Sequence, residues 1–169
     1  YGTTTSYDST VTASQSPVTG NNFADVSAYV SGLKPCTNYH FRVKAENDFG
    51  TSYGPDITFY PCKLPTLTTT SISEITATTA ISGGYITDEG CSYIIDKGVE
   101  SYRVILSPRG FPIKTDLKKT HDGTGTGSFN SNLTGLLPLR TYYVRSYATD
   151  SIGTAYGNTI SFQTLSSGK

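Results

Sequence analysis

The chain of 169 residues contains no methionine and no tryptophan, and only 15% of its residues are charged. Thirteen lysines and arginines balance thirteen acidic residues, so the formal net charge is zero. Binding to nucleic acid or to an anionic membrane surface usually draws on a basic excess, which this chain lacks. It also has no apolar run of about 18 residues, the length that a membrane-spanning helix needs. We therefore expect no nucleic-acid partner and no membrane insertion.

Threonine and serine are abundant instead, alongside 17 glycines, 13 tyrosines and 8 prolines. Threonine and tyrosine favour strands, whereas glycine and proline favour turns and weaken helix interiors. The composition therefore predicts an all-β chain.

An internal repeat organises the sequence. Residues 31–59 align without a gap on residues 134–162, and 12 of the 29 positions are identical. The offset of 103 residues is the length of a domain rather than of one turn of a solenoid. We therefore expect two domains of one kind, over residues 1–62 and 63–169.

Each copy of the repeat is predicted to contain a β-hairpin. From Tyr39 to Glu46, apolar and polar side chains alternate, which is typical of a strand with one buried face. A turn at residues 47–50 and a second strand at residues 57–59 complete the hairpin. Residues 26–30 alternate in the same way, so we expect a further strand there.

Both copies begin with the pattern Leu-x-Pro-x-x-x-Tyr. The proline fixes the backbone at a corner of the sandwich, and the tyrosine hydroxyl can bond back to that backbone. The two sets are Leu33, Pro35 and Tyr39, and Leu136, Pro138 and Tyr142. The pattern resembles the tyrosine corner of fibronectin type III domains, and the surrounding stretch is similar to repeats of secreted Bacteroidota surface proteins. The resemblance implies two tandem fibronectin-III or immunoglobulin-like β-sandwiches, an extracellular or cell-surface location and a scaffolding role.

The second domain is expected to be a complete sandwich. Its first three strands fall within residues 65–104, with a bulge at Gly83 and Gly84. An insert lies near residues 106–122, and the Gly-Thr-Gly-Thr-Gly stretch at residues 123–127 is a loop.

The first domain is expected to lack its N-terminal strands. The shared glycine of the repeat is Gly32 in the first domain and Gly135 in the second, and Gly32 is less than half as far from Tyr1 as Gly135 is from Pro65. An open sandwich exposes a core face and unpaired backbone groups. The missing strands belong either to a longer polypeptide or to another chain that adds strands by β-augmentation. We expect the assembly edge to include Tyr1, Tyr7, Val11, Val26 and Val30.

Three cysteines converge on the expected domain junction. A Cys36–Cys62 disulfide would close a loop of about 26 residues and add roughly 3 kcal/mol of stability. Cys91 is then free, or paired across the junction or between chains. A zinc site is disfavoured because no Cys-x-x-Cys pair is present.

Three positions match modification patterns. Asp8-Ser9-Thr10 and Asp150-Ser151-Ile152 resemble the O-glycosylation acceptors of Bacteroidota, which points to Ser9 and Ser151. Asn132 begins an N-glycosylation sequon, but its apolar neighbours place it on a strand, which favours a chance match.

No catalytic, cofactor or metal site is expected, because neither histidine has a ligand-spaced partner and no nucleophile motif is present. We expect a non-catalytic structural subunit of an extracellular bacterial surface fibre or adhesin stalk. Its partners would be copies of itself or neighbouring repeats of a longer chain. The alternative is a spacer or carbohydrate-binding module of a secreted enzyme, with Tyr102, Tyr143 and Tyr147 stacking on sugar rings.

Overall fold

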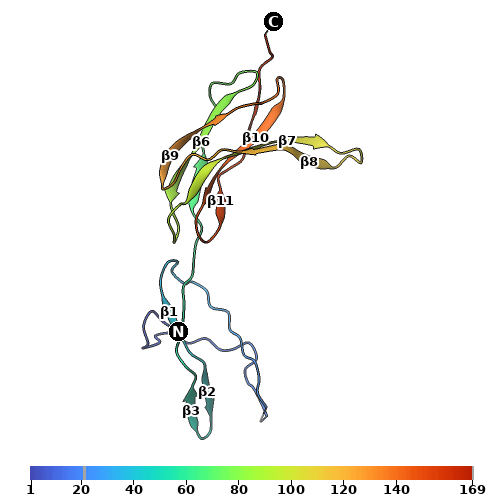
Figure 1. Ribbon diagram of the computed structural model, residues 1–169. Coiled ribbons are helices and arrows are strands. Elements are labelled where there is room, and N and C mark those ends of the chain that lie inside the picture. Colours follow the sequence, from blue (N-terminus) through green and yellow to red (C-terminus); the bar gives the residue numbers. More distant parts are fainter. Residues whose placement is uncertain (21, 169) are drawn as a thin grey trace. The chain divides into compact units, whose positions relative to one another are not determined.

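The computed structural model describes residues 1–20 and 22–168, and every regular element in that part is a β-strand (Figure 1). The prediction of an all-β chain is therefore confirmed. The chain divides into two compact units, Tyr1–Cys62 and Lys63–Lys169. Within the described residues, none of the secondary structure is a long apolar helix of the kind that crosses a bilayer.

The second unit is a sandwich of two antiparallel sheets. One sheet has the order β5-β6-β9, and the other has the order β11-β10-β7-β8, with β12 also paired to β10. The strands are β5 (Thr66–Thr69), β6 (Ala80–Asp88), β7 (Asp96–Leu106), β8 (Pro112–Lys119), β9 (Gly127–Leu133), β10 (Thr141–Thr149), β11 (Thr154–Tyr156) and β12 (Ile160–Gln163). Residues 112–119 of the expected insert thus form a strand that pairs with β7.

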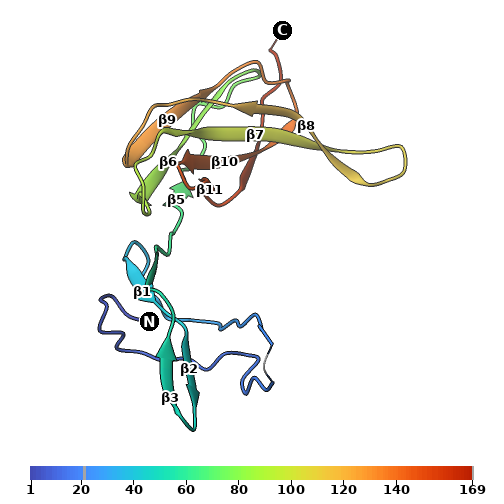
Figure 2. The same cartoon turned by 60° about the horizontal axis from the view of Figure 1, so that its bottom comes forward.

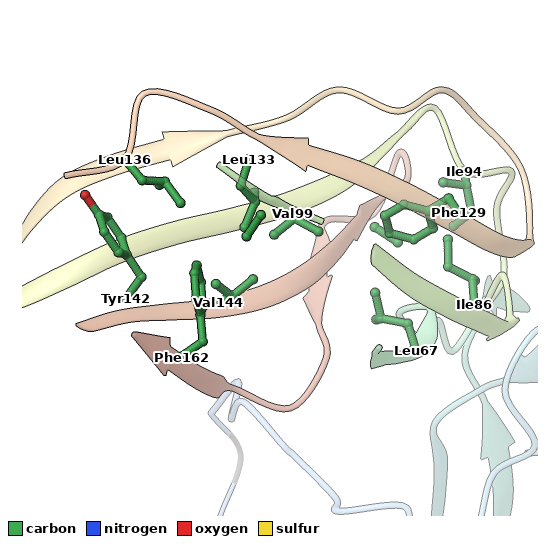
Figure 3. Close-up of a cluster of buried hydrophobic side chains, with 12 residues drawn as sticks. Leu67, Ile86, Ile94, Val99, Phe129, Leu133, Leu136, Tyr142, Val144 and Phe162 are labelled. Atoms are coloured by element: carbon green, nitrogen blue, oxygen red, sulfur yellow. The ribbon is translucent and has the colours of Figure 1, made fainter. Parts of the chain in front are cut away.

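The core of the second unit lies between these two sheets. Strand β9 shows how the sequence builds it, because Phe129, Ser131 and Leu133 are buried while the residues between them are exposed. Burial of each large apolar side chain contributes about 1.5–3 kcal/mol. Figure 3 shows the cluster, which consists of Leu67, Ala80, Ile86, Ile94, Val99, Phe129, Leu133, Leu136, Tyr142, Val144, Ala148 and Phe162.

The bulge expected at Gly83 and Gly84 is wrong. Gly83 lies opposite Asn130 and Gly84 opposite Phe129 in an uninterrupted register, and the irregularity falls between β5 and β6 instead. Glycine is required at Gly83 because strand β9 passes very close to it. A Cβ added to Gly83 would lie 2.0 Å from the carbonyl oxygen of Phe129, so only glycine fits there.

The first unit contains two short hairpin ladders. Strand β1 (Tyr39–Phe41) pairs with β4 (Ile57–Phe59), and β2 (Lys44–Asn47) pairs with β3 (Gly50–Tyr53). The strand expected at residues 26–30 is wrong, because that segment has no strand assignment. No neighbouring strand among the described residues pairs with residues 26–30. An alternating sequence forms a strand only where a neighbour bonds to its backbone groups.

The repeat is preserved in the backbone at the offset found in the sequence. Tyr39 lies opposite Phe59 and Tyr142 opposite Phe162, and each pair stacks its rings, at centroid distances of 5.6 and 6.0 Å. Every other pair in the ladders of the first unit except Asn47 with Gly50 has its counterpart in the ladders that β10 forms with β11 and β12. The two units therefore contain the same module, residues 39–59 and residues 142–162, which we call the hairpin module.

Both copies also form the tyrosine corner. The backbone N–H of Lys34 donates to the Tyr39 hydroxyl at 3.0 Å, and that of Leu137 donates to the Tyr142 hydroxyl at 2.9 Å. In each corner one residue adopts a positive φ, 56° at Cys36 and 55° at Leu139. Agreement at this level shows that the repeated sequence specifies the same local geometry twice.

Candidate assembly surface of the first unit

Within the hairpin module, β10 of the second unit is mostly buried, whereas its counterpart β2 in the first unit is exposed. Val144, Ser146 and Ala148 of β10 have no exposed surface. At the position of Ser146, the first unit has Val43, which is 50% exposed, and Ala45 at the position of Ala148 is also exposed. The face that the sheet β5-β6-β9 covers in the second unit therefore has no such cover among the described residues of the first.

Apolar side chains are exposed throughout the first unit. Tyr39 is its one buried side chain among the large apolar residues that the structure describes. At least 40% of the side chain is exposed at Val11, Val18, Phe23, Val26, Tyr29, Val43, Phe49, Tyr53, Ile57 and Tyr60. Contact of this much apolar surface with water is unfavourable, so the first unit gains stability from whatever covers it.

The hairpin module of the first unit also has an unpaired edge. In the second unit, β7 runs beside β10 and places Tyr102 opposite Tyr143. In the first unit, a single bridge between Gly2 and His40 lies at the equivalent position. Beyond this bridge, β2 pairs only with β3 among the described residues. The edge of β2 that corresponds to the β7 side of β10 is therefore unpaired among the described residues.

Arg42 of the first unit takes the position of Arg145 in the second. Its guanidinium lies 3.8 Å from the ring centre of Tyr53, as that of Arg145 lies 3.7 Å from Tyr156. Arg145 also donates to the carboxylate of Glu100 on β7, at 3.1 Å. In the described part of the chain, no carboxylate is bonded to Arg42. The Arg42 guanidinium also lies 4.2 Å from the ring centre of Tyr7.

The segment that precedes the module is held against it by polar contacts. The Tyr7 hydroxyl donates to Asp56 Oδ1 at 2.6 Å, and His40 Nδ1 lies 2.9 Å from Asp56 Oδ2. The bond from Tyr7, and to a lesser extent that from His40, holds the pKa of the Asp56 carboxyl below its usual range. The same bond to Asp56 raises the pKa of Tyr7. Tyr1 is fixed by backbone bonds to Ser9, at 2.8 and 3.0 Å.

The structure changes the expected assembly edge. Tyr1 precedes Gly2 of the bridge, and Tyr7 bonds to Asp56. Val11, Val26 and Val30 lie in segments without strands, so they do not form an edge. The free edge is β2. The alternation of its sequence is the same as that of a strand with neighbours on both sides. The signal for it is the repeat, because β10 has a neighbour on the side where β2 has none.

The Cys36–Cys62 disulfide is wrong. Cys36 and Cys91 are both disulfide-bonded, whereas Cys62 is a free and exposed thiol. The backbone N–H of Cys36 donates to the carbonyl of Pro61, which brings the two segments together without joining Cys36 to Cys62. Sequence proximity at one end of a domain thus does not decide which sulfur atoms meet.

Alkylation separates the two kinds of cysteine. We expect iodoacetamide to modify Cys62 of the native chain without reductant, because its thiol is exposed, and Cys36 and Cys91 only after reduction. Peptide mapping by mass spectrometry measures this directly. Modification of Cys36 in the unreduced protein would contradict the assignment, and a fully reduced and denatured sample controls for reactivity.

The three modification candidates lie at the surface. Asn132 is exposed on β9, and Ser9 is exposed in the N-terminal segment. Ser151 is also exposed, and its hydroxyl is 2.7 Å from that of Ser92. Glycosylation of these residues stays a prediction.

The tyrosine platform for sugar rings is wrong. Tyr147 is 1% exposed and Tyr102 is 8% exposed, so neither can stack on a ligand. The Tyr147 hydroxyl donates to the carbonyl of Thr120 at 2.6 Å and lies 3.0 Å from Asp96 Oδ2. Burial, together with this carboxylate, raises the pKa of Tyr147. The residue is part of the folded core rather than of a binding surface.

Neither histidine is part of a ligand cluster in the described residues, where no three His, Cys, Asp or Glu side chains could hold a metal ion. His40 pairs with Asp56, and His121 lies 3.0 Å from Asp96.

No family model matches the chain, and no curated protein matches it. Among solved structures, it is similar to the sensor domain of the anti-sigma factor RsgI4 of Pseudobacteroides cellulosolvens, with 17% identity and a TM-score of 0.41 over 62% of this chain and 97% of that one. It is similar to the FN1-FN3 domains of chicken CNTN1, with 18% identity and a TM-score of 0.44 over 79% of this chain and 45% of that one. A fibronectin type III domain of the human KIAA0970 protein gives 17% identity and a TM-score of 0.39, over 61% of this chain and 75% of that one.

Proposed function

We propose that this chain is a non-catalytic structural module of an extracellular surface fibre or adhesin stalk, in which a strand from another copy completes the first unit. The β-sandwich fold fits a structural or spacer module. Completion by another copy is supported by the difference in burial between the two hairpin modules. Val43 and Ala45 are exposed where Ser146 and Ala148 have no surface in contact with water.

Two further observations support this proposal. The free edge of β2 presents unpaired backbone groups, which another chain can satisfy by β-augmentation. The two disulfide-bonded cysteines fit an oxidising environment, as outside a cell. The competing role as a carbohydrate-binding module loses its candidate surface, because Tyr102 and Tyr147 are buried.

Hydrogen–deuterium exchange tests the proposal. We compare the dilute chain with the concentrated chain, and follow the peptide covering residues 41–47 by mass spectrometry. Residues 41–47 should exchange fast when dilute and slowly in the concentrated state, because an added strand protects the amides of β2. The peptide covering residues 144–150 is the matched control and should be protected in both states.

Negative-stain electron microscopy of the concentrated sample completes the test, with filaments of regular subunits as the expected result. Fast exchange of residues 41–47 at every concentration, in particles that stay monomeric, would contradict the proposal.

A further inference from the structure

The β7–β8 hairpin extends beyond the sheet to which it belongs. Strand β7 pairs with β10 only as far as Tyr102, and its remaining residues pair with β8 alone. Figures 1 and 2 show this hairpin, in yellow, extending away from the rest of the second unit. We call residues 103–119 the arm. The arm has sheet neighbours on neither outer side in the described residues. Its lysines contact the second unit: Lys118 Nζ donates to the carbonyl of Gly135 at 2.8 Å, and Lys114 and Lys119 lie over tyrosine rings.

The arm carries apolar side chains that face water. Leu106 is 73% exposed and Phe111 is 68% exposed, on either side of the turn that joins the two strands. The other exposed apolar residues of the arm are Val104, Ile105, Ile113 and Leu117. Successive side chains of a strand point to opposite faces, so Ile105, opposite Ile113, lies on one face of the arm, and Val104 and Leu106 lie on the other. Exposed apolar surface of this kind marks an interaction site.

The charge of the arm is opposite in sign to that of the first unit. Residues 103–119 contain five basic residues and one acid, which gives a net charge of +4 in a chain whose total is zero. The single acid, Asp116, is already paired with Arg103. The first unit, in contrast, contains five acids against three basic residues, a net charge of −2. Opposite charges favour contact between the arm and the first unit, whereas contact between two arms is repulsive.

Both surfaces also have an unpaired strand edge. Strand β8 is the last strand of its sheet, with β7 as its one partner among the described residues, and β2 has only β3. An open hollow of about 310 Å³ lies beside β2 and β3, lined by residues that include Ala45, Glu46 and Phe49. Phe49 is 99% exposed at the tip of this hairpin. The edge, the hollow and the acid Glu46 are therefore within the same small region of the first unit.

We propose that the arm of one copy docks on the open side of the first unit of a second copy, with β8 beside β2 and the apolar arm residues over the exposed module. This inference rests on the proposed function and names the surface that carries it out. The contact is heterologous, since the two copies use different surfaces, and repetition of such a contact gives a filament. An apolar tip with basic flanks would also suit an anionic lipid surface, but lipid would leave the acidic first unit uncovered.

Isotope-coded cross-linking tests the contact between copies. Equal amounts of unlabelled and 15N-labelled full-length chain are mixed at high concentration and treated with a zero-length carbodiimide, which joins lysine amines to carboxylates. We expect Lys114, Lys118 or Lys119 to be joined to Glu46 or Asp48, with mixed-label products as frequent as same-label products. Same-label products alone would mean that an arm contacts its own first unit, and this result would overturn the proposal, as would the lack of any such link.

A pair of matched variants tests the apolar contact. Leu106→Ser changes a leucine of the arm, and Leu165→Ser makes the same change at a leucine that is 56% exposed outside it. In sedimentation velocity, L106S should weaken self-association by about tenfold, as for an interface anchor, and L165S should leave it unchanged. Circular dichroism confirms that both variants keep the fold. Equal association of the two variants would overturn the proposal.

The outcomes separate this inference from the proposed function. If residues 41–47 become protected on assembly while L106S associates normally, the proposed function stands and the arm is not the donor. If the chain stays monomeric, both fail. Co-sedimentation with vesicles of equal parts phosphatidylcholine and phosphatidylserine covers the lipid alternative. Vesicle binding that L106S abolishes, with self-association unchanged, would assign the arm to a membrane and overturn the proposal.

Discussion

Replacing Phe162 with alanine is expected to lower the free energy of unfolding of the second unit by about 3–5 kcal/mol. Phe162 is 8% exposed and its ring stacks on that of Tyr142, so its removal leaves a cavity that the two sheets cannot close. A loss of this size is a large part of the roughly 5–15 kcal/mol that stabilises a typical domain. Urea denaturation followed by circular dichroism measures it.

The repeat provides the matched control for this change. Phe59 occupies the same position in the first unit and stacks on Tyr39, but it is only partly buried. Phe59→Ala should therefore cost the dilute chain well under about 1 kcal/mol, because little cavity is formed. Equal losses for the two variants would show that the first unit possesses a sealed core of its own, and the proposed assembly would lose its basis.

The second large effect is expected from Gly83→Ala. The added methyl group would lie 2.0 Å from the carbonyl oxygen of Phe129 and 3.1 Å from the Cα of Asn130, so the β6–β9 pairing must open. We expect a loss of at least about 3 kcal/mol, near the upper end of overpacking effects. A loss of that size corresponds to a fall of at least about 12 °C in melting temperature for a domain of this size.

Gly168→Ala is the control for this substitution. A Cβ at Gly168 meets no atom within 4 Å, so the same chemical change should leave the melting temperature within about 1 °C, as for a surface substitution. Differential scanning calorimetry compares the two variants with the parent chain. A G83A variant with the melting temperature of the parent chain would mean that β6 and β9 do not pair in the register described above.

Local patterns in the sequence predict much of the hairpin module. The alternation from Tyr39 to Glu46 and the Leu-Pro-Tyr corners specify geometry through side chains close in sequence, and both copies form it. The alternation at residues 26–30 is just as regular, yet no strand forms there. A strand depends on a neighbour that satisfies its backbone groups, and an alternating pattern does not say whether that neighbour exists.

The errors at the cysteines and glycines have the same origin. Whether Cys36 pairs with Cys62 or with another sulfur depends on Cβ positions that spacing along the chain does not determine. The role of Gly83 depends on how closely β9 approaches it, which only the packed sheet shows. The arm is recognisable in the sequence as an insert, but the sequence alone does not distinguish exposed apolar residues in an insert from residues that join the core.

The shared register of the two hairpin modules has a consequence for folding. Strand β7 completes β10, but β1 and β2 present a similar backbone edge at the same offset, with the same residue at three of the nine positions from Tyr39 to Asn47. During refolding, a β7 strand therefore meets two acceptors that differ little in backbone geometry. At high chain concentration, one of these acceptors belongs to a different molecule, and exchanged species compete with correct folding, as in other tandem arrays of similar domains. The side chains that differ between the two copies are then what keeps each strand with its own partner.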